Sequence, residues 1–79
     1  MKRNRIARLW IARKMAQAAW DKASEAAWAI GENGGWRGQP REAEHLAAVA
    51  ADHTAHRRLV AADVAFFDEI AQVIRLIHL

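Results

Sequence analysis

The sequence predicts an all-α fold, an antiparallel two-helix hairpin with a long second helix that assembles as a helical-bundle homo-oligomer. Three observations support this prediction. All four glycines and the only proline of the 79 residues fall in one stretch, GENGGWRGQP, which separates two segments without helix breakers. In both segments apolar residues recur at alternating steps of three and four. Alanine, the strongest helix former, is abundant in both segments.

These signals define one domain, residues 1–79, that holds both helices and the connection between them. We expect a first helix at about residues 3–31, a glycine-rich loop at 31–39 and a second helix at about 40–78. A short glycine-rich connection makes the two helices antiparallel neighbours.

The first helix is expected to present one apolar stripe that contains a single charged residue. Its members are Ile6, Leu9, Arg13, Ala16, Trp20, Ala23, Ala27 and Ile30. This spacing is that of a heptad seam, the stripe that a helix buries against another helix. Gly31 or Gly34 can supply the left-handed residue that closes the helix.

The second helix is expected to begin at Pro40, which suits the first helical position, with Glu42 and Glu44 at its positive end. A stripe in the same steps of three and four then runs to the C-terminus. Its members are Leu46, Val49, His53, His56, Val60, Asp63, Phe67, Ile70, Ile74 and Ile77. The middle of this stripe is polar and its C-terminal part is strongly apolar.

The expected second helix is longer than the first by about ten residues, or about 15 Å. The surplus is the apolar segment IAQVIRLIHL, residues 70–79, which a single hairpin would leave in water. Exposed apolar patches of this kind mark interfaces. We therefore expect a homo-oligomer, most simply a dimer, whose interface contains Phe67, Ile70, Ile74 and Ile77.

Polar residues in the middle of the second stripe suggest a polar core layer. On a helical wheel His45, Asp52, His56 and Asp63 lie within about 40° of one another. Asp52 and His56 have the i, i+4 spacing of a hydrogen-bonded pair. In an antiparallel hairpin Arg13 falls opposite Asp63. We expect Arg13, Asp52, His56 and Asp63 to form a layer that fixes the register and the oligomeric state.

A divalent metal site is the alternative interpretation of the same residues. Its ligands would come from His45, Asp52, His53, His56 and Asp63. The first helix contributes no histidine, and the charge of Arg13 would oppose a cation. We therefore expect no metal and no cofactor, with His45, Asp52 and His56 as the weak candidates for ligands.

The sequence contains few residues of the types that act as catalytic nucleophiles. There is no cysteine or tyrosine, and Ser24 is the only serine, which nearly excludes an activated nucleophile. A two-helix chain is also not expected to form a pocket of useful size. We therefore expect a protein that is not an enzyme and has no catalytic residues.

The sequence contains no apolar run of the roughly 18 residues that a membrane span needs. Arg8 and Arg13 interrupt the apolar run near the N-terminus, which makes it a poor secretory signal. We therefore expect a soluble protein of the cytoplasm.

The net charge of +3 is unevenly distributed. Residues 1–14 carry six basic side chains and no acidic one, whereas residues 15–79 have a net charge of −3. A basic helix can neutralise phosphates, so nucleic-acid binding is an alternative function. The residues that would carry it are Arg3, Arg5, Arg8 and Lys14. These charges are scattered around the helix, which argues against a membrane-surface helix.

The four tryptophans are the other candidate binding residues. Trp20 lies on the first stripe and is expected in the core. Trp10 and Trp28 share a flank of the helix, about 80° away from that stripe. Trp36 stands in the loop beside Arg37, where it can anchor a partner or fold back over the hairpin end.

The sequence as a whole favours a small interaction protein that self-associates and binds a macromolecular partner. We expect Trp36, Arg37, Trp10 and Trp28 to form the partner-binding surface. Helical proteins of this size often act as adaptors or as stoichiometric inhibitors or regulators, including those of phages and other mobile elements.

Overall fold

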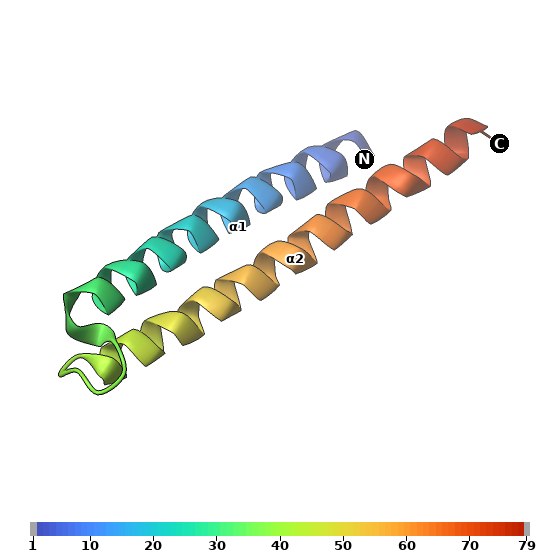
Figure 1. The fold of residues 1–79 in the computed structure, drawn as a ribbon. Coiled ribbons are helices and arrows are strands. Elements are labelled where there is room, and N and C mark those ends of the chain that lie inside the picture. Colours follow the sequence, from blue (N-terminus) through green and yellow to red (C-terminus); the bar gives the residue numbers. More distant parts are fainter. Residues whose placement is uncertain (1, 79) are drawn as a thin grey trace.

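The computed structural model describes the backbone of residues 2–78 and the side chains of residues 4–78. The chain forms α1 (Lys2–Ile30), the short segment η1 (Gly31–Gly35), which is kinked at Asn33 and Gly34, and α2 (Glu42–His78). Figure 1 shows α1 and α2 side by side and antiparallel, in a rod of 60 × 16 × 14 Å. The described residues contain no strand, so the predicted all-α class is confirmed.

The stripe predicted for α1 is the one that packs against α2. All eight of its members are buried or half-buried, whereas most of the residues between them are exposed. Ala27, at 6% exposure, is the most deeply buried of them. Arg13 lies in this stripe and is half-buried. Heptad spacing therefore identified the buried side of α1 correctly.

The stripe predicted for α2 is wrong by one residue. Leu59 and Phe66 are buried at 6% and 8% exposure, whereas their neighbours Val60 and Phe67 are 47% and 53% exposed. We call the stripe that packs against α1 the inner seam. Its members are His45, Ala48, Asp52, Ala55, Leu59, Ala62, Phe66, Glu69 and Val73, all buried or half-buried.

The error has a physical cause. A shift of one residue rotates the stripe by about 100° but keeps the steps of three and four unchanged. The inner seam places alanine at every seventh position, at Ala48, Ala55 and Ala62. Small side chains let two helices approach closely. A prediction based on large apolar residues favours the neighbouring stripe, because that stripe contains more of them.

The predicted stripe of α2 therefore exists, but it faces away from the centre of the hairpin. We call it the outer seam. Its members are Leu46, Val49, His53, His56, Val60, Asp63, Phe67, Ile70, Ile74 and Ile77. Val49, Asp63 and Ile70 are half-buried at its border with α1, and the other members are exposed.

The core of the hairpin is small as a result. Ala27, Leu59 and Phe66 are the only buried hydrophobic residues in the described part of the chain.

Gly34, with φ of 92°, supplies the left-handed residue and is one of the two positions predicted for it. The start of α2 differs from expectation. α2 begins at Glu42, so Pro40 precedes the helix instead of occupying its first position. Arg5 near the start of α1 lies against Glu69, and α2 continues beyond the N-terminus of α1 to His78 (Figure 1).

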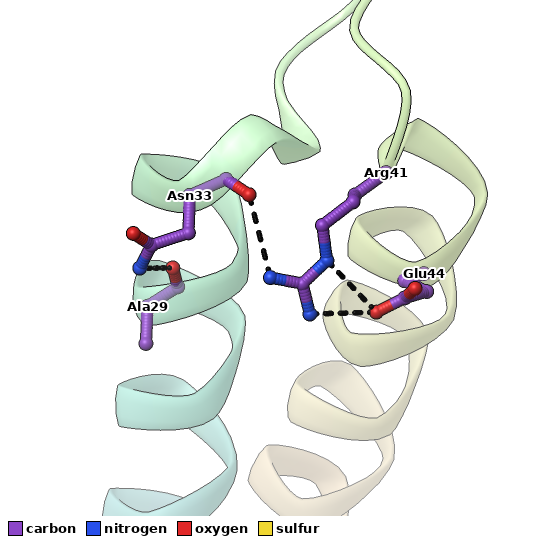
Figure 2. A network of polar contacts seen from close by, with 4 residues as sticks. All are labelled: Ala29, Asn33, Arg41 and Glu44. Atoms are coloured by element: carbon purple, nitrogen blue, oxygen red, sulfur yellow. Dashed lines mark hydrogen bonds and ion pairs between the residues drawn. The ribbon is translucent and has the colours of Figure 1, made fainter.

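Arg41 joins the two sides of the connection (Figure 2). Its guanidinium donates to the carbonyl oxygen of Asn33 at 3.3 Å and to the carboxylate of Glu44 at 2.7 Å. The Asn33 side chain in turn donates to the carbonyl oxygen of Ala29 at 2.7 Å. The hydrogen bond and the positive charge from Arg41 lower the pKa of Glu44. These contacts hold the last turn of α1 against the first turn of α2.

Gly35 is the position where the connection has least room. A Cβ atom there would lie 2.5 Å from the carbonyl oxygen of Ile30 and 2.8 Å from Cβ of His45. We predict that Gly35→Ala lowers the free energy of unfolding by about 1–3 kcal/mol, because the backbone of the connection must move to make room for the added methyl group. Urea denaturation at one fixed protein concentration measures this loss.

Gly38→Asn is the matched control. Gly38 has a φ of 82°, a Cβ atom there would meet nothing within 4 Å, and asparagine tolerates that backbone conformation. Gly38→Asn should therefore lower the free energy of unfolding by less than Gly35→Ala does, because it adds backbone strain without a steric clash. Equal losses in both variants would contradict the steric account of Gly35.

Candidate interaction surface

One side of the rod collects most of the exposed large apolar side chains. In an antiparallel pair of right-handed helices, the residues that directly follow seam positions point to the same side of the pair. Trp10 and Trp28 follow seam positions on α1, and the outer seam follows the inner seam on α2. We call Trp10, Trp28 and the outer seam together the outer face.

The outer face is apolar chiefly in the C-terminal half of α2. Phe67 and Ile74 are each about half exposed, and Ile77 is 74% exposed. The whole chain exposes 6171 Å², whereas a compact protein of 8.9 kDa is expected to expose about 4,800 Å². The hairpin alone therefore leaves unusually much of its surface in water.

The opposite side of the rod is different in character. Apart from Met15, which is 68% exposed, its exposed positions are mainly small or charged. They include Ala12, Ala19, Ala26, Ala61, Ala65, Arg58, Asp68 and Arg75. The large apolar side chains are thus unevenly divided between the two sides. This asymmetry identifies the outer face as the candidate interaction surface.

The ion pair expected between Arg13 and Asp63 forms in the structure. Nε of Arg13 lies 2.6 Å from Oδ1 of Asp63, and the two side chains are 35% and 37% exposed. The Arg13 guanidinium also lies 5.6 Å from the ring centre of Phe66 and 5.1 Å from that of Phe67. Arg13 therefore contacts both the inner seam and the outer face.

The hydrogen bond expected between Asp52 and His56 is wrong. Asp52 instead accepts a hydrogen bond of 2.6 Å from Oγ of Ser24 on α1. His56 is exposed, and its ring centre lies 4.6 Å from the indole of Trp20. His56 therefore belongs to the outer face and not to the polar layer of the core.

Glu69 is a polar core residue that the heptad pattern did not predict. It is 7% exposed, and its carboxylate accepts a hydrogen bond of 3.1 Å from Nε of Arg5. In the sequence, the burial of Glu69 is indicated only by its position three residues after Phe66, in the register of the inner seam. Among the described residues, the side-chain hydrogen bonds between α1 and α2 are therefore Arg5 with Glu69, Arg13 with Asp63, and Ser24 with Asp52.

The weak metal-ligand candidates are engaged separately. His45 packs against Trp36 with ring centres 5.2 Å apart, while Asp52 and His56 make the contacts described above. Among the described residues, no three histidines or carboxylates gather closely enough to hold a metal ion. The structure thus does not bring His45, Asp52 and His56 together as a ligand set.

The loop tryptophan folds back onto the hairpin. Trp36 packs edge-on against Trp28 at 6.0 Å and against His45, yet 43% of it stays exposed. Trp10 lies on the same face near the other end of the rod, and Arg37 is exposed. The assignment of Trp10, Trp28, Trp36 and Arg37 to partner binding stays a prediction.

The candidate nucleic-acid residues partly make contacts within the chain. Arg5 is bound to Glu69, and the ammonium group of Lys14 lies 5.3 Å from the ring centre of Trp10. Arg8 is exposed, and the side chain of Arg3 lies outside the described residues. Nucleic-acid binding by this helix stays a prediction.

Comparison with known proteins identifies no relative of this chain. No protein family, no curated protein and no solved structure matches it. Within the described residues, neither helix is long and apolar enough to cross a membrane.

The pairing of Arg13 with Asp63 can be tested by a double-mutant cycle. We predict that Arg13→Leu lowers the free energy of unfolding by about 1 kcal/mol, because it removes the partner of Asp63. The expected loss is small because water screens an ion pair whose two side chains are each about one third exposed. In an Asp63→Leu background, the loss of unfolding free energy caused by Arg13→Leu should be smaller than in the parent. The difference between the two losses should be about 0.5–1 kcal/mol.

Urea denaturation of the two single variants and the double variant measures this coupling. Arg58→Leu, at an exposed arginine of α2, is the control and should change stability by no more than about 0.5 kcal/mol. Strictly additive losses at the two positions would show that Arg13 and Asp63 are energetically independent.

Proposed function

We propose that this protein is a non-enzymatic helical interaction protein that self-associates through its outer face and contacts a macromolecular partner. One observation carries the proposal: α2 has two heptad stripes offset by one residue, and α1 covers only one of them. A heptad stripe is the pattern that a helix presents to another helix. A second helix pair on the outer face would bury the second stripe.

The small core gives a further reason for self-association. A hairpin of this length with three buried hydrophobic residues has little apolar burial to offset the conformational entropy of folding. Association that buries the outer seam stabilises the folded state by mass action. Folding and assembly are then linked, as in other small helical bundles.

The loop end of the rod is the proposed contact for the macromolecular partner. Trp28 and Trp36 expose an aromatic pair there, and Arg37 stands beside it. Tryptophan and arginine are the side chains most enriched among residues that dominate binding energy. An assembled hairpin with such an end would serve as an adaptor or as a stoichiometric regulator.

Sedimentation equilibrium over a wide range of protein concentration tests the self-association. We predict that the parent chain sediments as an assembly of at least two 8.9 kDa chains. Ile74→Lys places a charge on the outer seam and should weaken the association at least about tenfold. Ile74 is half exposed in the hairpin, so this change leaves the inner seam intact.

Ala61→Lys is the matched control, because Ala61 is an exposed residue of the same helix on the opposite side of the rod. It should leave the association constant unchanged. A folded parent chain that keeps its single-chain mass at every concentration would refute the proposal. Equal weakening by both lysines would place the interface elsewhere.

A further inference from the structure

We infer that the occupant of the outer face is a second copy of this chain lying antiparallel, in a two-fold dimer centred near Val60. The inference rests on the self-association proposed above and adds its direction and register. Two features of the molecule support it, the distribution of charge along the rod and the spacing of the outer seam.

The two ends of the rod carry opposite net charge. Trp20 lies against His56, so residues 2–19 and 57–78 form one half of the rod and residues 20–56 the other (Figure 1). The first half carries nine basic and three acidic side chains, a net charge of +6. The second half carries three basic and six acidic side chains, a net charge of −3.

This asymmetry favours one direction of association. Packed helices lie about 8–10 Å apart, which is close to the screening length of physiological salt, about 8–10 Å. Like charges on two stacked rods therefore still repel one another. A parallel dimer would stack the two basic halves, whereas an antiparallel dimer places each basic half over an acidic half.

The outer seam matches itself in the same direction. Val60 is the midpoint of α2, whose bounds are Glu42 and His78. Leu46, His53, Val60, Phe67 and Ile74 recur at every seventh residue. Turning a second copy end over end about Val60 places Leu46 opposite Ile74 and His53 opposite Phe67. An interface of this kind is isologous, so each contact occurs twice.

Polar residues of the outer seam, together with Arg57 beside it, fit this register. Arg57 is exposed, and in the hairpin its guanidinium donates to the hydroxyl of Thr54 at 3.2 Å. The two-fold axis would bring Arg57 near Asp63 of the second copy, whose carboxylate is 37% exposed. His53 would meet an aromatic ring, as His56 meets Trp20 within one chain.

Distances between spin labels distinguish the two directions. The chain has no cysteine, so Ala47→Cys and Ala61→Cys each provide one labelling site, and both residues are exposed on the side away from the outer face. In the antiparallel dimer the labels at Ala61 should lie about 25–30 Å apart, across two helical layers. Those at Ala47 should be separated by about 40 Å more along the rod, giving roughly 45–50 Å.

Pulsed electron–electron double resonance on the two labelled chains measures these distances, and sedimentation of the same chains gives their mass. A long distance at Ala47 with a short one at Ala61 supports the inference. Short distances at both sites would indicate a parallel dimer and overturn it, while leaving self-association intact. A long distance at both sites would overturn the register about Val60. No intermolecular distance at either site, with a single-chain mass, would refute the proposed function itself.

Discussion

The offset of one residue between two heptad stripes on α2 is the constraint on which the rest of the structure depends. A single neighbouring helix covers one stripe, because the two are rotated by about 100° from each other. α1 covers the stripe of Leu59 and Phe66, and Val60 and Phe67 remain exposed. The small core, the large exposed surface and the apolar outer face all follow from that choice.

Polar pairs explain why α1 covers the stripe with the smaller apolar side chains. Asp52 and Glu69 lie on the inner seam, where Ser24 and Arg5 of α1 donate hydrogen bonds to them. Rotating α2 by one residue would carry both carboxylates away from these donors. Arg13 binds Asp63 at the border between the two seams, a pair that is compatible with either register. The apolar outer seam is thereby left for another helix pair.

The sequence alone predicts the hairpin, the buried stripe of α1 and the pairing of Arg13 with Asp63. These depend on the position of glycine and proline and on antiparallel geometry, which leave few alternatives. The register of α2 could not be predicted in the same way, because both stripes have the same period and alanine contributes no strong apolar signal. The burial of Glu69 and the exposure of His56 were missed for that reason, since both depend on the register.

Oxidative footprinting of Phe66 and Phe67 tests the two-seam account most directly. Adjacent residues of the same type share their chemistry and differ only in the seam to which they belong, with exposures of 8% and 53%. We expect Phe66 to be protected from hydroxyl radicals at every protein concentration. Phe67 should be oxidised rapidly in dilute protein and become protected as the chain is concentrated. Equal oxidation of the two rings in dilute, folded protein would contradict the assignment of the inner seam.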